Sequence, residues 1–158
     1  MGQKIKWALC KFCGREVKLN GAGSDATAFQ RFIRGVVGAI NPVTVELFRE
    51  ATDYHDMAYH IGPTFFKTPE EAQREADEAF FDMMHLAIKD PKSHSRLGVF
   101  NRGLVRSTPW YFEYQAWKFY KAVRLKGHEV YPKLSCQHKE RVFIKGDVRD
   151  VELANQIA

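Results

Sequence analysis

The chain has 158 residues, 45% of them hydrophobic and 13% aromatic, and a net charge of +5. This length and apolar content predict one domain, residues 1–158, with a packed core. No apolar run is long enough to cross a bilayer, and the first residues contain no small-residue cleavage site of a signal peptide. Three cysteines are too few for a disulfide framework. We therefore expect the chain in the cytoplasm of the producing cell, or in a particle assembled there.

The N-terminal part predicts small elements ahead of the first long helix. Residues 4–17 are basic with interspersed apolar residues, which indicates a short strand or a knuckle around Cys10 and Cys13. Residues 20–25 have the composition of a loop. A Ser or Asp at the end of this loop is suited to cap a helix over residues 26–33.

A long helix is predicted over residues 42–60. Asn41 is suited to cap its N-terminus, and Pro42 suits its first position. Gly62 and the proline after it should end the helix, because neither continues a helical backbone.

A second long helix is predicted over residues 69–88. It begins with Thr68 as cap, then Pro69 and two acids in the first turn. After a polar loop at 89–98, a proline at position 109 opens a third helix over 110–125, which Gly127 should end. Residues 141–147 are compatible with a strand and a turn.

The third helix is rich in aromatic residues, with lysines between them. This pattern suits either the headgroup layer of a membrane or a helix packed across the two preceding helices. We favour core packing with one aromatic rim left exposed. The fold class expected is mainly α, a single domain with two antiparallel site-bearing helices and a third aromatic helix packed beside them. Its core covers about residues 26–127, with mixed N- and C-terminal extensions.

Four polar residues on the first two long helices form the most informative pattern of the chain. His55 and Tyr59 are one helical turn apart and share a face, whereas Asp56 points elsewhere. Asp77 follows His55 by 22 residues, which is enough for the second helix to return antiparallel to the first. This arrangement offers a base, a carboxylate that orients it, a phenol and a separate carboxylate for a cation.

The pattern His55-Asp56-x-x-Tyr59, followed by Ala76-Asp77-x-x-Phe80, resembles the phospholipase A2 superfamily. It is most similar to the viral and phage branches that lack the disulfides of the secreted enzymes. The resemblance covers roughly residues 41–81. It implies that His55 activates a water, that Asp77 orients His55 and that Tyr59 braces Asp77. A ring nitrogen of His55 should then lie about 2.6–3.2 Å from a carboxylate oxygen of Asp77.

The resemblance also implies a calcium ion held by Asp56 and by backbone carbonyls of an upstream glycine-containing loop. Gly35 and Gly38 mark the best candidate for this loop, although the tight glycine-rich consensus of the family is absent. Residues 21–23 are an alternative loop, and an ordinary turn explains the same glycines. Asp53 and Asp82, which lie near the motif, are expected to be solvated surface acids.

A zinc site is a separate prediction. Cys10 and Cys13 have the spacing of a knuckle and are followed by a glycine. Cys136 and His138, far downstream, would complete four ligands and pin the tail to the N-terminus. Unrelated thiols and a chance Cys-His pair explain the same residues, so both interpretations stay open.

The leading hypothesis is a calcium-dependent ester hydrolase acting at a phospholipid or membrane surface. One alternative is a non-catalytic viral or phage structural or accessory protein whose partners are virion or host proteins. Another is a basic binding module built on a zinc knuckle. The positive charge favours anionic partners such as acidic lipids, and nucleic acid stays open as a partner.

Overall fold

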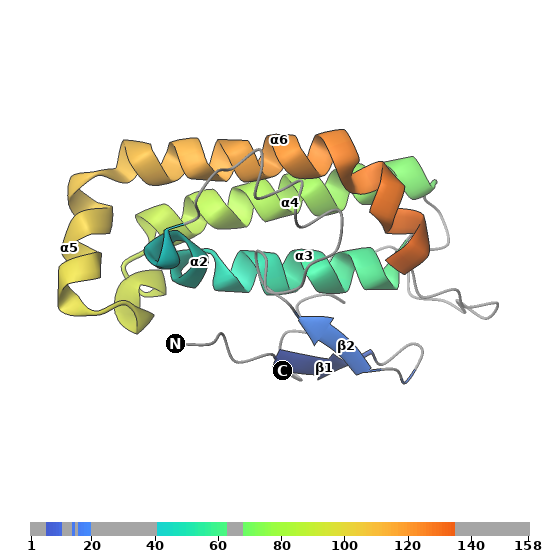
Figure 1. Cartoon of the computed structure of the whole chain (residues 1–158), viewed down its shortest axis with the longest axis horizontal. Coiled ribbons are helices and arrows are strands. Elements are labelled where there is room, and N and C mark those ends of the chain that lie inside the picture. The colour runs from blue at the N-terminus through green and yellow to red at the C-terminus, as the bar shows by residue number, and fades with distance from the viewer. Residues whose placement is uncertain (1–5, 11–13, 15, 20–40, 63–67, 135–158) are drawn as a thin grey trace.

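The fold, a computed structural model, is dominated by three long helices that lie side by side (Figure 1). The structure describes residues 6–10, 14, 16–19, 41–62 and 68–134. Three further short helical segments and one two-stranded sheet accompany the long helices in this part of the chain. The expected mainly α fold class is therefore confirmed. The helix at 26–33 and the strand at 141–147 lie outside the described residues.

The first predicted helix is divided into two. Helix α2 covers Pro42–Leu47 and helix α3 covers Arg49–Ile61. The Asn41 side chain accepts a hydrogen bond from the Val43 amide, so the predicted cap is confirmed. The prediction of one continuous helix was wrong, because the helix is interrupted at Phe48. The backbone of Phe48 leaves helical geometry, and its side chain is buried in the core. Its ring meets Phe119 edge to face, with 6.3 Å between the ring centroids.

Helix α4 covers Pro69–Lys89 and begins as its sequence predicts. The Thr68 hydroxyl accepts from the Glu71 amide, and the Glu71 carboxylate accepts from the Thr68 amide. This reciprocal capping box satisfies two amides that would otherwise lack partners at the helix start. The loop predicted after α4 instead contains a short 3-10 turn, η1, at Ser93–Arg96, and helix α5 follows at Val99–Ser107.

Helix α6 covers Pro109–Leu134 and is longer than predicted. The expected end at Gly127 was wrong, because this glycine lies inside the helix and is buried against α3 and α4. A Cβ atom there would overlap the Tyr59 hydroxyl and lie 2.7 Å from Nε2 of Gln73. Gly127 therefore allows a close approach between helices and does not act as a stop signal.

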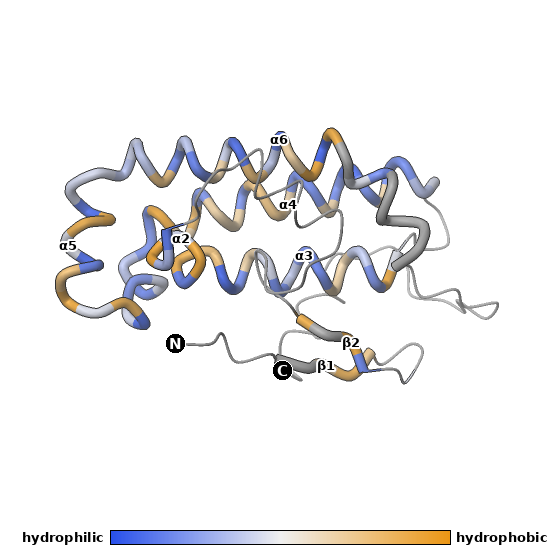
Figure 2. Tube along the Cα trace, in the orientation of Figure 1, coloured by the Kyte–Doolittle hydropathy of each residue, from blue (hydrophilic) through white to orange (hydrophobic). Residues whose placement is uncertain are grey.

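The main core lies between α2, α3, α4 and α6. It contains fully buried aromatic and aliphatic side chains from all four, including Phe48, Phe80, Met84, Phe112 and Phe119. Hydrophobic and hydrophilic residues alternate along the tubes of the long helices (Figure 2), as expected of helices with one buried face. The aromatic helix thus packs beside the two predicted helices, as expected. None of the described helices is both long and apolar enough to span a bilayer.

A small antiparallel hairpin packs against the other side of α3. Strands β1, Lys6–Leu9, and β2, Glu16–Leu19, pair with Trp7 opposite Lys18 and Ala8 opposite Val17. Its inner side chains form a second core with a residue of α3, composed of Ala8, Cys10, Val17, Leu19 and Met57. The short strand predicted within residues 4–17 is therefore present, and it supports α3 from the face opposite α4 (Figure 1).

Candidate functional site

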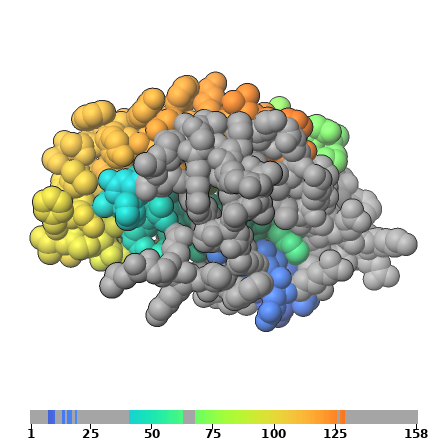
Figure 3. All heavy atoms as spheres, in the orientation of Figure 1, coloured from blue at the N-terminus to red at the C-terminus, as the bar shows by residue number. Residues whose placement is uncertain are grey.

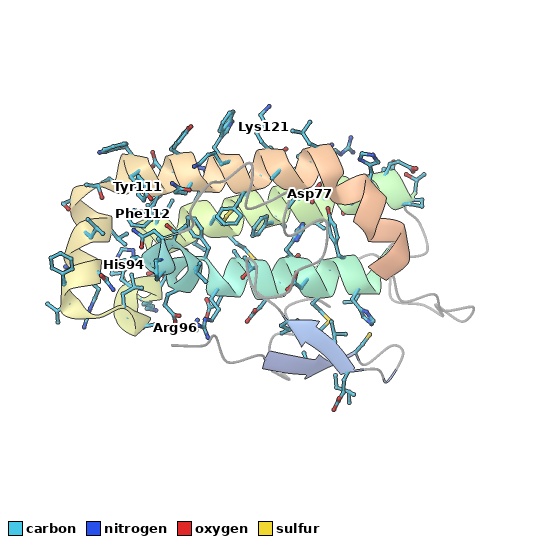
Figure 4. The ribbon with its side chains drawn as sticks, in the orientation of Figure 1. Asp77, His94, Arg96, Tyr111, Phe112 and Lys121 are labelled. Carbon is cyan, nitrogen blue, oxygen red and sulfur yellow. The ribbon has the colours of Figure 1, made fainter. Side chains whose placement is uncertain are left out.

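The candidate site is centred on the carboxylate of Asp77 in α4, which is 0% exposed. Its Oδ1 atom accepts a hydrogen bond from the Tyr59 hydroxyl at 2.6 Å and lies 2.9 Å from Nε2 of His55. Figure 4 shows Asp77 within the body of the helical domain. A buried carboxylate is costly unless its oxygens are hydrogen-bonded, so these contacts make the burial tolerable.

Helix geometry brings the three side chains together. His55 and Tyr59 are one turn apart on α3, so both reach toward the same level of the neighbouring α4. Their rings are in contact, with 4.1 Å between centroids. The predicted distance between His55 and Asp77 is confirmed, as is the predicted contact of Tyr59 with Asp77. The catalytic roles of these residues stay predictions.

Arg124 is a member of the site that the sequence reasoning missed. Its Nη1 atom donates to Oδ2 of Asp77 at 3.1 Å, and its side chain is 35% exposed. Helix α6 therefore contributes a charge to a centre otherwise built by α3 and α4. The sequence around Arg124 contains no motif that would predict its contact with Asp77.

Burial raises the pKa of the Tyr59 phenol far above its usual value, and the neighbouring Asp77 carboxylate raises it further. A hydrogen bond from Gln73 and the charge of Arg124 oppose this rise without cancelling it. Tyr59 is consequently a neutral hydrogen-bond donor at all ordinary pH values. It can hold the carboxylate in place, but it cannot serve as a base.

The hydrogen bond to Asp77 also decides which nitrogen of His55 can act as a base. An ionised carboxylate only accepts hydrogen bonds, so Nε2 carries the proton and Nδ1 keeps a lone pair. No hydrogen bond joins Nδ1 to any residue in the described ranges. The imidazole is further held by the ring of Phe80, 4.6 Å away between centroids.

Only some residues of the predicted calcium site lie within the described ranges. Asp56 is half-buried on α3, next to His55, and supplies the hard oxygen that calcium prefers. The predicted loop around Gly35 and Gly38 lies outside the described residues. Among residues that the structure describes, no cluster of three or more acidic, histidine or cysteine side chains could hold a metal. Among the described residues, a calcium ion at Asp56 would therefore have to take its further ligands from backbone carbonyls.

The two acids near the motif behave differently from each other. Asp82 is exposed, as expected for a surface residue. The same expectation for Asp53 was wrong, because Asp53 is buried on α3. Its position two residues before His55 places it on the side of α3 away from Asp77.

Of the four predicted zinc ligands, only Cys10 lies within the described residues. Cys10 is buried at the end of β1, and its carbonyl accepts a hydrogen bond from the Gly14 amide at 2.7 Å. Gly14 has a φ of 64°, a conformation that favours glycine. This hydrogen bond brings the backbones of Cys10 and Gly14 together. Cys13, Cys136 and His138 lie outside the described residues.

Comparisons of the chain with protein-family models, with curated proteins and with solved structures found no match. The site must therefore be interpreted from its own geometry.

Proposed function

We propose that this chain is a phospholipase A2-like hydrolase that cleaves a carboxylic ester of a phospholipid. The observation that carries the proposal is the 2.9 Å contact between Nε2 of His55 and Oδ1 of the buried Asp77. It leaves Nδ1 as the only ring nitrogen able to take a proton. The contact is also the one that the His-Asp-x-x-Tyr resemblance implies.

In the proposed reaction, Nδ1 of His55 removes a proton from a water while the water oxygen attacks the ester carbonyl. The acyl carbon–oxygen bond to the alcohol then breaks, and the imidazolium returns its proton to the leaving alkoxide. Asp77 keeps the imidazole in the correct tautomer and stabilises its positive charge. Tyr59 and Arg124 hold the carboxylate oxygens still, so that Asp77 does not rotate away from His55.

Calcium fits the chemistry of Asp56 as one ligand, with Gly35 and Gly38 in the loop that would supply carbonyls. When bound, the ion would polarise the ester carbonyl and stabilise the oxyanion. The resemblance is the support for this part, together with the hard carboxylate next to the proposed base.

The test of the function is hydrolysis by purified full-length protein with calcium present. Vesicles containing anionic phospholipid suit a chain with a net charge of +5. Wild-type protein should release fatty acid, and His55→Gln should not, although both melt at similar temperatures. His85→Gln is the matched control, because His85 packs against Phe81 and lies about two helical turns beyond Asp77 on α4. Absence of turnover by folded wild-type protein on several lipid classes would refute the proposal.

A second candidate is a non-catalytic structural or accessory protein that retains the helical scaffold. The observation that favours it is the saturation of Asp77 by three partners from two other helices, which would stabilise a scaffold equally well. A binding module built on a zinc knuckle is a third candidate, favoured by the backbone hydrogen bond from Gly14 to Cys10. Turnover that depends on His55 separates the first candidate from both others.

A further inference from the structure

Helix α6 exposes a continuous row of aromatic and basic side chains. The row, called here the α6 outer stripe, consists of Trp110, Tyr114, Trp117, Lys118, Lys121 and Leu125. Trp110 is 66% exposed, and Tyr114, Trp117 and Leu125 are each about half exposed or more. These spacings of three and four residues place the six side chains on one helical face.

The opposite face of α6 is buried. Phe112, Ala116, Phe119 and Val123 point into the main core, so the stripe does not result from a loosely packed helix. Figure 4 shows Lys121 projecting away from α3 and α4, on the side of α6 opposite the core. In the space-filling view, the orange atoms of α6 form an edge of the molecule (Figure 3).

Basic and aromatic groups are paired along the stripe. The rings of Tyr114 and Trp117 are stacked, with 6.1 Å between centroids. Nζ of Lys118 lies 5.0 Å from the Tyr114 ring, and Nζ of Lys121 lies 5.6 Å from the Trp117 ring. Such contacts hold the flexible lysines beside the aromatic platform. The stripe therefore presents positive charge and flat apolar surface at the same level.

The charge of this face contrasts with that of α4. The charged residues of the stripe, Lys118 and Lys121, are both basic, whereas Glu113 beside them is acidic and Arg124 is paired with Asp77. The exposed or half-buried charged residues of α4 up to Asp82 are mostly acidic, namely Glu70, Glu71, Arg74, Glu75, Glu78 and Asp82. An anionic surface would consequently be attracted by α6 and repelled by α4.

We propose that the α6 outer stripe binds the surface of an anionic phospholipid bilayer. Trp and Tyr rings favour the headgroup layer, where one part of the ring is apolar and another is polar. The two lysines decide against a protein partner, because protein interfaces are enriched in aromatic residues but depleted of lysine. Near lipid, lysine extends its ammonium group toward phosphates while its methylenes remain in apolar surroundings.

The dimensions of the stripe agree with a helix lying in the plane of the membrane. From Trp110 to Leu125 the helix extends about 22 Å at 1.5 Å per residue. The inference rests on the proposed function, since it names the surface that would hold the hydrolase on the membrane containing its lipid. Binding can nevertheless be measured without turnover, so the two proposals can fail separately.

The test is co-sedimentation of full-length protein with vesicles of phosphatidylcholine alone or mixed with phosphatidylglycerol. Wild-type protein should bind the mixed vesicles much more tightly. Lys118→Gln/Lys121→Gln should weaken this binding by at least about tenfold, because each lysine near an anionic surface contributes a factor of about five. Trp110→Ala/Trp117→Ala should also weaken it, and should lose the blue shift of tryptophan fluorescence that vesicles cause.

Matched controls come from α4 and the segment after it. Lys89→Gln/Lys92→Gln removes the same charge from exposed positions, and Leu86→Ala shortens an apolar side chain that is 63% exposed. Neither should change vesicle binding. Equal losses in the control and stripe variants would overturn the proposal. It would also be overturned by a wild-type dimer that the tryptophan variant abolishes, without any vesicle binding.

A second substrate distinguishes failure of this surface from failure of the hydrolase. A short-chain phosphatidylcholine below its micelle concentration requires the site but no bilayer. The stripe variants should hydrolyse it at the wild-type rate while losing activity on vesicles. Equal losses on both substrates would show that the stripe acts on the site and does not bind the bilayer.

Discussion

Arg124 of α6 and Asp77 of α4 form an ion pair in which Nη1 lies 3.1 Å from Oδ2. The aspartate is fully buried, whereas the arginine side chain is about one third exposed. The guanidinium thus neutralises a buried charge from the edge of the domain. Because the other oxygen of Asp77 bonds His55 and Tyr59, one carboxylate connects all three long helices.

Replacing Arg124 by Gln should reduce both activity and stability. The free energy of unfolding should fall by about 1 kcal/mol or less, because solvent screens the exposed end of the pair. Hydrolysis should fall further, since Asp77 is freer to turn away from His55. Arg124→Lys should restore part of the loss, because lysine keeps the charge without the planar fork. Arg106→Gln, at an exposed position on α5, is the control, and urea denaturation with turnover assays measures both effects.

Gly127→Ala should destabilise the fold, although alanine is the better helix former. Helix propensity alone would stabilise by about 1 kcal/mol. A Cβ at this position overlaps the Tyr59 hydroxyl, however, and must displace it from Asp77. Gly103→Ala in α5 is the control, because its Cβ would meet nothing within 4 Å. Thermal melting should move down for Gly127→Ala and up for Gly103→Ala. A rise for both would contradict the close approach at Gly127.

Tyr59 should make stability sensitive to alkaline pH. Its pKa is raised in the folded state, so the folded chain keeps a proton that the unfolded chain loses above about pH 10. The unfolded state then binds fewer protons, and the free energy of unfolding falls by about 1.4 kcal/mol per pH unit from this group. Tyr59→Phe should lose this part of the slope. Denaturant titrations between neutral and strongly alkaline pH measure it, and identical slopes would exclude the effect.

Asp56→Asn should abolish calcium binding measured by calorimetry. Asp56 is the one carboxylate that the prediction places at this site, so wild-type affinity should be weak, with a Kd of about 10⁻⁴ to 10⁻³ M. Asp82→Asn, at an exposed acid on α4, is the control and should bind as the wild type does. Equal calcium heats for wild-type protein and Asp56→Asn, or no heat for either, would refute the site.

If zinc is bound by Cys10, Cys13, Cys136 and His138, the purified protein should contain about one zinc ion per chain. A chelator should then lower the melting temperature, because a structural metal contributes its binding free energy to folding. Cys13→Ser should reproduce the effect of the chelator. Absence of zinc in metal analysis, with melting unchanged by chelation, would favour the reading of unrelated thiols.

Features that depend on neighbours in the sequence were predicted correctly. Asn41 and Thr68 cap their helices because the hydrogen bonds reach amides only two or three residues away. The contact between His55 and Asp77 could also be predicted from the sequence, because it required only two adjacent antiparallel helices and the motif that they carry. The His-Asp-x-x-Tyr spacing places His55 and Tyr59 on one face whatever the rest of the fold does.

Features that depend on contacts between residues far apart in the chain could not be predicted from the sequence. Gly127 has the usual appearance of a helix terminator, and only its contact with Tyr59 reveals a different role. Arg124 meets a residue 47 positions earlier in the chain, with no motif to indicate the pairing. The interruption at Phe48 likewise accompanies packing against Phe119, a residue of another helix. In each case tertiary packing overrides the local preference.

Because Arg124 follows Asp77 by 47 residues, it is added to the growing chain after the other members of the site. His55 and Asp77 leave the ribosome well before the residue that completes their charge balance. A chain interrupted after α4 would possess the motif but would lack α6, whose buried side chains complete the main core and whose Arg124 pairs with Asp77. Truncated products should therefore remain unfolded and be degraded, so a cell making this protein would not accumulate partially assembled fragments.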